Sequence, residues 1–445
     1  CGPADADLAV QGARAAFESG VWSNMAPLER KRVLVRWAEL IDTHREELAL
    51  LETLDVGKPI SDTYNIDVPS AVRTIRWSGE AIDKVYDEIP PTPAETLALV
   101  QRLPLGVVVA ITPWNFPLST TAWKLAPSLA TGNSVILKPA SNTPLSALFI
   151  ARLAAEAGLP DGVLQVLPGP GGSLGKHLAL HMDIDGMTFT GSTPVGKQLM
   201  QYSGQSNLKR TFLELGGKSP NIVFADADLE KAAAMAAVAV FYNGGQTCTA
   251  GTRLIVERCI QDEFLERVKD SARHWMPGDP LDPATAMGPM IDAAQCRTVA
   301  EYVEIGRQEG AEIVCGGEQA LQDSGGFYYP PSIFAGVNNA MRIAQEEIFG
   351  PVLAVIPFDT ADEAVTIAND SIYGLAGAVW SRNINTAHRV AAAVRVGTMG
   401  INNYFGGDIT VPFGGFKQSC NGRDKSIHAF HDYTELKTTW IEFES

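Results

Sequence analysis

The sequence lacks paired cysteines. Its six cysteines lie at positions 1, 248, 259, 296, 315 and 420, and none forms a Cys-x-x-Cys pair. Such pairs are typical of structural zinc sites and thiol redox centres, so we expect neither a metal site nor a redox motif. Scattered cysteines in a large chain are typical of a reducing compartment, which predicts an intracellular, cytoplasmic protein.

Long apolar runs are also missing. No uninterrupted apolar stretch is long enough to span a bilayer, and the start of the chain has no signal-like pattern. The most apolar stretch, residues 231–242, is rich in alanine and predicts a buried helix. We therefore expect no membrane partner. The chain begins with Cys1 rather than methionine, which suggests a further N-terminal piece.

Positive charge is scarce. The chain has 35 basic and 51 acidic residues, a net charge of −16, and no long basic run. Binding to phosphate backbones needs clustered lysine and arginine, so no nucleic-acid partner is expected. With 46% hydrophobic and 19% charged residues the composition is that of a soluble globular protein. A length of 445 residues predicts two or three domains.

Strand-like and helix-like segments alternate between residues 106 and 203 with short links. This alternation predicts an open parallel sheet, which binds ligands beyond the carboxyl ends of its strands. The same alternation continues after residue 213 to about residue 430, in a second α/β unit. Before it, residues 5–56 and 66–84 show helical spacing, with a second helix ending at Gly57. Four prolines break the pattern at 89–106, and 434–443 predicts a closing strand.

Cys248 differs from the other five cysteines in its surroundings. It lies in "NGGQTCTA", residues 243–250, among small and polar residues directly after the apolar stretch. A free cysteine is most often a small buried hydrophobe. Glycines beside a thiol, however, allow a ligand to approach closely. This stretch alone leaves both packing and a nucleophile open.

Two further residues are candidates for catalysis. Glu214, in "FLELGGKSP", follows a strand-like run, and desolvation there would raise its pKa toward the range of a general base. An exposed strand-end carboxylate is the alternative. Asn115, in "TPWNFP", lies in a proline-fixed loop where its amide would donate to an oxyanion, or would simply cap the next helix.

The usual dinucleotide fingerprint, Gly-x-Gly-x-x-Gly, is absent. Instead "FTGSTPVG" places Gly191 and Ser192 between a strand and a helix, where free N–H groups bind pyrophosphate. Lys138 ends a strand in "VILKPAS", and "QEEIFGPVL" contains Glu346 and Glu347. Taken singly, the lysine is better explained as a surface residue, and the two carboxylates are either a site or a solvated turn.

Together these segments resemble the aldehyde dehydrogenase superfamily, and within it the bacterial aminoaldehyde dehydrogenases of the γ-glutamyl-γ-aminobutyraldehyde type. The matching motifs are "PWNFP", "KPAS", "FTGSTPVG", "LELGGK", "GGQTC", "EEIFGP" and "PFGGFKQS", which occur in the family's order over nearly the whole chain. The resemblance implies an α/β fold with an open parallel-sheet cofactor domain (1–85 and 105–215), an α/β catalytic domain (216–430) and a β oligomerisation arm (86–104 and 431–445). A homodimer or homotetramer is expected.

The resemblance also implies roles for the catalytic candidates. Cys248 would attack the aldehyde carbonyl, while Asn115 and the Cys248 backbone N–H hold the oxyanion. Glu214 would activate the water that cleaves the resulting thioester, since covalent catalysis of this kind needs a base in its second half. Lys124 and Asp424 resemble the family's proton-relay pair, although many members have glutamate in place of Asp424.

A nicotinamide dinucleotide cofactor is implied as well. The matching positions are Thr112, Trp114, Lys138, Ser141, Thr190, Gly191, Ser192, Leu215, Glu347 and Phe349. Lys138 and Glu347 would bind the two riboses, and Ser192 and Trp114 the pyrophosphate. Members strict for NAD often have glutamate where this chain has Ser141. We therefore expect NAD, with NADP possible.

Five aromatic residues would line the aldehyde tunnel by motif position: Phe116, Trp123, Tyr404, Phe405 and Phe413. Aromatic walls suit an extended chain, a cation held over the ring faces, or a plain aromatic or aliphatic aldehyde. Asp67 is a further candidate, for assisting a substrate amine.

Two features depart from the family pattern. Cys420 stands where the family usually has glycine, and a positive φ there would strain a cysteine. The family usually also has further strands before the point where this chain begins.

The sequence thus predicts NAD(P)-dependent oxidation of an aldehyde to a carboxylic acid through a cysteine thiohemiacetal and thioester, with aminoaldehydes or related aldehydes as substrates. One alternative is an acylating dehydrogenase that passes the thioester to coenzyme A. Another is a catalytically silent structural or binding protein on the same fold. The presence of Glu214 argues against the first, and the Cys248, Glu214 and Asn115 set argues against the second.

Overall fold

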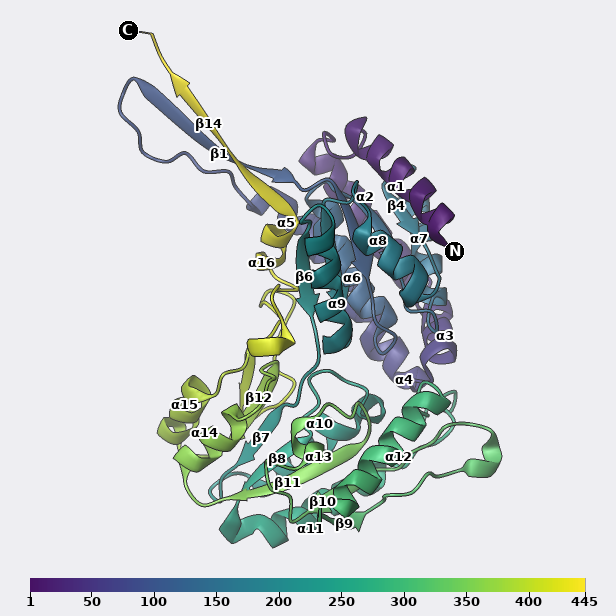
Figure 1. Cartoon of the computed structure of the whole chain (residues 1–445), viewed down its shortest axis with the longest axis vertical. Coiled ribbons are helices and arrows are strands. Elements are labelled where there is room, and N and C mark those ends of the chain that lie inside the picture. Colours follow the sequence, from purple (N-terminus) through teal and green to yellow (C-terminus); the bar gives the residue numbers. More distant parts are fainter. Residues whose placement is uncertain (445) are drawn as a thin grey trace.

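A computed structural model describes residues 1–444 as two α/β lobes and one projecting β arm (Figure 1). Each lobe is built around its own sheet, of five strands in the first lobe and seven in the second. The chain passes from the first lobe to the second between Glu214 and Pro220. The carboxyl edge of the first sheet therefore faces the second lobe (Figure 1).

The five-stranded sheet of the first lobe has the order β4-β3-β2-β5-β6, and all neighbouring strands are parallel. This confirms the open parallel sheet predicted from the alternation. The strands are β2 (Val107–Ile111), β3 (Ser134–Lys138), β4 (Leu164–Val166), β5 (Gly186–Thr190) and β6 (Arg210–Glu214). The connecting helices are α6 (Pro117–Ala130), α7 (Leu145–Ala157), α8 (Lys176–Leu180) and α9 (Thr193–Gln205).

The N-terminal helices pack against this sheet through two clusters of buried apolar side chains. The sequence predicted one continuous helix up to Gly57, but the helix is broken at His44, where φ is −99° and ψ is 27°. The helices are α1 (Pro3–Glu18), α2 (Pro27–Thr43), α3 (Arg45–Val56), α4 (Ile60–Asp62) and α5 (Val68–Ala81), with a π-helical turn at Thr63–Asp67.

The sheet of the second lobe has the order β13-β12-β7-β8-β11-β10-β9 and is parallel except for β9. Its strands are β7 (Pro220–Val223), β8 (Arg253–Glu257), β9 (Glu312–Cys315), β10 (Ser332–Ala335), β11 (Val352–Phe358), β12 (Ala376–Trp380) and β13 (Thr398–Ile401). Its helices are α10 (Leu229–Phe241), α11 (Gln261–Ala272), α12 (Ala293–Gln308), α13 (Arg342–Gln345), α14 (Ala361–Asn369) and α15 (Ile384–Ala393). The apolar stretch at 231–242 forms most of α10, as predicted.

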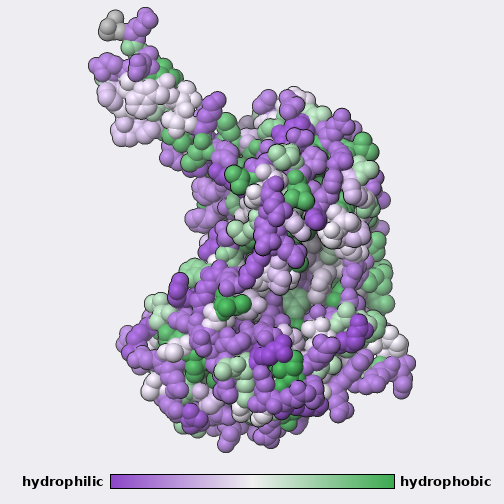
Figure 2. All heavy atoms as spheres, in the orientation of Figure 1, coloured by the Kyte–Doolittle hydropathy of each residue, from purple (hydrophilic) through white to green (hydrophobic). Residues whose placement is uncertain are grey.

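The arm consists of β1 (Thr96–Pro104) and β14 (Thr434–Glu442), which pair antiparallel over nine residues each. It stands away from both lobes, and Figure 2 shows hydrophobic side chains along it among hydrophilic and intermediate ones. Leu436, Trp440 and Phe443 are all more than half exposed there. Among the described residues, no helix combines the length and apolar character that crossing a membrane requires.

A largely irregular stretch, residues 402–427, leads from β13 back to the first lobe and is called here the return segment. It is followed by α16 (His428–Asp432), from which β14 begins. The backbone N–H groups of Phe416 and Gln418 donate to carbonyls of the second lobe, at 2.8 and 3.0 Å. Ser419 accepts from Leu215 at 2.7 Å, at the end of β6. The return segment is thus bonded to both lobes.

Candidate active site

Four predicted site residues lie at the carboxyl ends of adjacent strands in the first lobe, or directly after them. The register pairs Lys138 of β3 with Ile111 of β2, and Ile111 with Phe189 of β5. Thr112 follows β2 directly, and Thr190 at the end of β5 pairs with Glu214 at the end of β6. Parallel strands of this kind end at one edge, so Lys138, Thr112, Thr190 and Glu214 form a row along it.

Glu214 is buried at the end of this row. Its Oε1 accepts a hydrogen bond from the thiol of Cys420, with 2.7 Å between Sγ and Oε1, whereas its Oε2 has no partner among the described residues. Burial and the nearby Asp424 carboxylate raise the pKa of Glu214 well above its ordinary value, while Lys124 and Arg423 oppose that shift. A carboxyl group with a raised pKa suits a general base near neutral pH.

Lys124 and Asp424 form a buried ion pair beside Glu214, with 2.7 Å between Nζ and Oδ2. Lys124 lies on α6, and Asp424 is held in the return segment by two backbone hydrogen bonds to Phe413, of 2.7 and 2.8 Å. Because buried charges are stable only when paired, neither partner is expendable for the local fold. The structure thus brings together the two residues that the sequence predicted as a pair.

The turn before Cys248 is built from left-handed backbone. Asn243, Gly244 and Gly245 have φ values of 51°, 63° and 71°. A Cβ atom on Gly245 would lie 2.1 Å from the carbonyl oxygen of Gly350, so only glycine fits there. This conformation ends α10 abruptly and turns the chain toward the first lobe.

Asn115 is fixed against this turn from the other lobe. Its Nδ2 donates to the carbonyl of Gln246 at 2.8 Å, and its own carbonyl accepts from Nδ2 of Asn243 at 3.1 Å. Asn115 is therefore bonded to the backbone of Gln246, which lies two residues before Cys248 in the sequence. A side-chain amide carries two N–H bonds, so one remains for an oxyanion.

Cys248 is partly buried and lies near two carboxylates. Burial raises the pKa of its thiol to about 12, and Glu347 and Glu214 add to the shift. A Cβ atom on Gly217 would lie 2.2 Å from the Cys248 carbonyl oxygen, so the glycine allows this approach. The backbone N–H of Gly217 also donates to Glu347 at 3.1 Å. Cys248, Glu214, Asn115 and Glu347 are thus gathered between the lobes.

The row along the first sheet fits a dinucleotide. The hydroxyl of Thr190 is buried with no partner among the described residues, and Nζ of Lys138 donates only to the adjacent Pro139 carbonyl, at 3.2 Å. Ser192 precedes α9 without capping it by its side chain, which leaves the first N–H groups of that helix available. Free N–H donors and an amine are the chemistry that binds pyrophosphate and ribose.

The other predicted cofactor residues lie around this row. Thr112 accepts from the Thr121 hydroxyl at 3.3 Å, and Gly191 donates its N–H to the Glu214 carbonyl at 3.0 Å. Trp114 packs edge-on against Phe349, with ring centres 5.2 Å apart. Leu215 is buried next to Gly196 of α9.

Two of these residues lie at opposite sides of the row. Ser141 is exposed beyond the end of β3, and its hydroxyl donates to the Gly169 carbonyl at 3.0 Å. Glu347 lies beside Gly216 and Gly217, where burial raises its pKa to about 7. Among the described residues, Ser141 and Glu347 are not in contact with each other.

The five predicted substrate residues form two groups. Trp123 and Phe413 pack with ring centres 5.0 Å apart, and Lys425 lies over both rings. The second group contains Phe116, Tyr404 and Phe405, which Tyr242 joins: its ring stacks on Phe116 at 6.1 Å and meets Phe405 at 6.2 Å. Tyr404 also donates its hydroxyl to the Thr249 carbonyl at 2.6 Å, one residue after Cys248.

Buried charges lie behind the second group. Asp67, the candidate for a substrate amine, is fully engaged with Lys58 at 2.7 Å, and Nζ of Lys58 lies 3.7 Å from the centre of the Phe116 ring. Asp62 is less buried, and burial raises its pKa to about 6. The hydroxyl of Tyr242 is buried without a partner among the described residues and is close enough to Asp67 and Asp62 for both to raise its pKa further, after burial.

The backbone at Cys420 is not strained. Its φ is −167° and its ψ is 152°, which is extended backbone open to any residue. The condition for strain, a positive φ, is not met. Cysteine instead differs from glycine here by the thiol that it places against Glu214.

Sequence reasoning missed Tyr242, Asn243 and Lys58 as parts of the site. Tyr242 ends an apolar stretch and looked like core, while Lys58 looked like a helix terminator. Asn243 carried a usable signal, because Asn-Gly-Gly favours left-handed backbone. Its role in holding Asn115 depends on a contact across 128 residues, which no local pattern contains.

The chain matches known proteins over nearly its whole length. A model described as the aldehyde dehydrogenase family matches residues 1–439. The chain is 52% identical over 442 residues to the NADP/NAD-dependent aldehyde dehydrogenase PuuC of Escherichia coli (strain K12), covering 99% of this chain and 88% of that protein.

Two solved structures are similar as well. One is an indole-3-acetaldehyde dehydrogenase in complex with NAD⁺, with 60% identity, a TM-score of 0.99, and coverage of 100% of this chain and 90% of that chain. The other is a γ-glutamyl-γ-aminobutyraldehyde dehydrogenase from Burkholderia cenocepacia J2315, with 54% identity, a TM-score of 0.98 and the same two coverages.

Proposed function

The chain belongs to the aldehyde dehydrogenase family, and we propose that it oxidises an aminoaldehyde or a related aldehyde to the carboxylic acid with NAD, and also with NADP. The observation that carries this proposal is the meeting of a thiol, an amide and a buried carboxyl group from three separate segments: Cys248, Asn115 and Glu214. Each supplies one function that oxidation through a thioester requires.

In the proposed mechanism, Sγ of Cys248 bonds to the aldehyde carbon as the thiol proton passes to solvent water. The free N–H of Asn115 and the Cys248 backbone N–H stabilise the oxyanion that develops. A cofactor held by Lys138, Thr190 and the start of α9 would supply a hydride acceptor, and loss of hydride from the adduct would leave a thioester on Cys248. Glu214 then takes a proton from water as that water attacks the thioester, and the acid is released with Cys248 as the leaving group.

Cofactor binding is assigned to the row on the first lobe. Thr190 offers a hydroxyl without a partner among the described residues, Lys138 offers an ammonium group that donates only to Pro139, and the start of α9 offers N–H donors for pyrophosphate. At Ser141 a hydroxyl stands in place of a carboxylate, so nothing at that position repels a 2′-phosphate. This supports the use of NADP beside NAD.

The preference for an amino group is supported by the carboxylates behind the Tyr242 ring. A protonated amine placed between Tyr242 and Asp62 would find a phenol oxygen without a partner and a nearby anion. Similarity to a γ-glutamyl-γ-aminobutyraldehyde dehydrogenase supports the same substrate class.

The decisive experiment follows reduced cofactor by absorbance with a panel of aldehydes, each with NAD and NADP and each with and without coenzyme A. We expect reduction without coenzyme A, and a lower KM for an ω-aminoaldehyde than for the aliphatic aldehyde of equal length. The variant Asp62→Asn should remove most of that KM difference. No reduced cofactor from any aldehyde contradicts the proposal, and a strict need for coenzyme A points to acyl transfer instead.

We further propose that the arm joins subunits into a homodimer or homotetramer in the cytoplasm. Exposed apolar side chains on the arm support this assembly, because Leu436, Trp440 and Phe443 find no cover within the described chain. The six free cysteines support a reducing compartment. Light scattering after size-exclusion chromatography tests the assembly, and Trp440→Glu should shift it toward smaller species.

A further inference from the structure

Cys420 lies directly opposite the catalytic carboxyl group in a short stretch of antiparallel pairing. Glu214 and Cys420 form a β-bridge, flanked by hydrogen bonds from Leu215 to the Ser419 carbonyl (2.7 Å) and from Asn421 to the Leu213 carbonyl (3.1 Å). Side chains directly opposite each other in such a pair share one face. The backbone therefore directs the thiol of residue 420 toward the Glu214 carboxyl group.

The thiol has two acceptors within reach but only one proton. Sγ lies 2.7 Å from Oε1 of Glu214 and 2.7 Å from the Gly422 carbonyl oxygen. That carbonyl already accepts from the guanidinium of Arg423 at 2.6 Å. Sγ in turn accepts from the Gly422 N–H at 3.3 Å and from Arg423 at 3.4 Å. Because the Gly422 carbonyl already has a donor in Arg423, the thiol donates its proton to Glu214.

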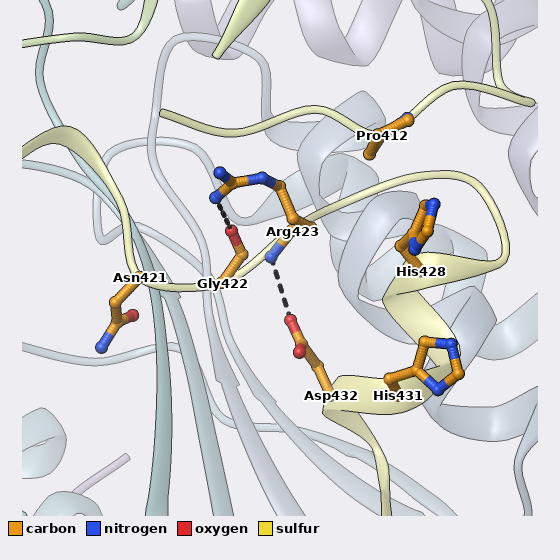
Figure 3. A pocket seen from close by; sticks show the side chains of 7 residues that line it. All are labelled: Pro412, Asn421, Gly422, Arg423, His428, His431 and Asp432. Carbon is orange, nitrogen blue, oxygen red and sulfur yellow. Dashed lines mark hydrogen bonds between the residues drawn. The ribbon is translucent and has the colours of Figure 1, made fainter. Parts of the chain in front are cut away.

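The loop that carries the thiol is fixed on its other side. Figure 3 shows residues 421–423 along the wall of a cavity of about 390 Å³, with the Arg423 backbone N–H directed at Asp432. That hydrogen bond measures 3.0 Å, and the Asn421 side chain accepts from the Leu213 N–H at 2.8 Å. The thiol is therefore held in place from both ends of its loop.

We propose that Cys420 is a positioning residue for Glu214: its S–H holds Oε1 and leaves Oε2 as the oxygen that takes the proton of the attacking water. Oε2 is buried with no partner among the described residues, and Gly414 lines the other side of Oε1, where a Cβ atom would lie 2.7 Å away. A glycine at position 420 offers no such donor. The inference rests on the proposed function, since it assumes that Glu214 is the hydrolytic base.

The charged and titratable groups around Glu214 decide in which direction its pKa shifts when the thiol is removed. They are Asp424 and Lys124 as a pair, Arg423 and Cys420 on the return segment, Tyr433, and Cys248 across the site. A donor that bonds to the carboxylate favours the ionised form and lowers its pKa. Removing the thiol therefore raises the pKa of Glu214, and hydrolysis is lost at a higher pH than in the unmodified enzyme.

The experiment measures decay of the acyl group on Cys248 by rapid quenching and intact-mass spectrometry, across a pH series, in the full-length enzyme with cofactor and aldehyde. For Cys420→Gly and Cys420→Ala we expect the acid limb of the decay rate to move up by about half to one pH unit, with KM unchanged, where one unit is a tenfold change below the limb. Cys420→Ser keeps a donor and should stay near the unmodified enzyme. Cys259→Ser, at an exposed cysteine of the second lobe, is the matched control.

Two results would overturn the proposal. One is an acid limb that does not move in Cys420→Gly and Cys420→Ala, whatever happens to the rate at its plateau. The other is a serine variant that behaves like the glycine variant. Cys420→Ala keeps Cβ and so serves if the glycine variant folds poorly. An unmodified enzyme that forms neither reduced cofactor nor an acyl group contradicts the proposed function itself, which separates the two failures.

Discussion

The proposed base and the proposed nucleophile of the site differ in the charges that surround them. Glu214, on the first lobe, has two cations near it, Lys124 and Arg423, which offset part of the effect of burial and of Asp424. Cys248, on the second lobe, is acted on by two carboxyl groups, Glu347 and Glu214, which add to the effect of burial. Both groups have raised pKa values. Cations oppose the shift at Glu214, whereas at Cys248 only backbone N–H groups, those of Thr249 and Cys248, oppose it.

This difference indicates that the two groups are activated differently. The ionisation of Glu214 is set in advance by its neighbours, so substituting a neighbour should shift it. The thiolate of Cys248 is disfavoured before substrate arrives, so the thiol must lose its proton as the carbonyl is attacked and the oxyanion is stabilised by Asn115. Four experiments test the contrast.

The largest effect is expected at the nucleophile. Cys248→Ala should lower turnover by about three orders of magnitude or more, because no thioester forms without Sγ. Affinity for the cofactor, measured by calorimetry, should stay within about twofold, since the cofactor row lies on the first lobe. Retained turnover would move the nucleophile to another residue.

Glu214→Gln should separate the two halves of the reaction. Glutamine keeps the shape but takes no proton, so steady-state turnover should fall by about 10²- to 10⁴-fold. The first equivalent of reduced cofactor should still appear in stopped-flow measurements. Glu346→Gln, next to Glu347 but bonded to Arg342 at the surface, is the matched control and should leave both phases unchanged. Loss of the first phase in Glu214→Gln would mean that Glu214 also deprotonates the thiol.

Alkylation by iodoacetamide tests the thiol directly. With a pKa raised to about 12, Cys248 should carry about 10³-fold less thiolate at pH 7 than an ordinary thiol, and its modification should accelerate steadily as pH rises. Peptide mass spectrometry of the enzyme without cofactor follows this rate, with exposed Cys259 as the internal reference. A rate at Cys248 that levels off below pH 9 would contradict the predicted direction.

The smallest effect on activity is expected from substitutions in the two buried ion pairs, Lys124–Asp424 and Lys58–Asp67. Asp424→Asn removes an anion that raises the pKa of Glu214, so the acid limb of activity should move to lower pH. Asp67→Asn breaks a pair of equal length and burial that faces the aromatic group, and should leave that limb in place.

Both ion-pair variants should lose about 3–5 kcal/mol of unfolding free energy, because each leaves an unpaired buried lysine. Denaturant unfolding checks that the two losses are comparable. Equal shifts of the acid limb in both variants would show that the limb reports general destabilisation instead of the charge at Asp424.

Sequence reasoning reached the parallel sheet because its strands are short buried runs separated by helical spacing. It also named Cys248, Glu214 and Asn115, whose surroundings in sequence are unusual. Their catalytic roles stay predictions until they are tested. The contact between Glu214 and Cys420 could not be predicted, because it joins residues 206 positions apart through a backbone bridge. The break at His44 was missed since apolar spacing continues across it.

The return segment has a mechanical consequence. It is bonded to the second lobe through Phe416 and Gln418 and to β6 through Ser419 and Asn421. A hinge rotation that separated the lobes at this edge would have to break one of these two sets of backbone hydrogen bonds. Glu214, the proposed base, is therefore held to both halves of the molecule, and we expect it to keep its position relative to Cys248 when substrate enters.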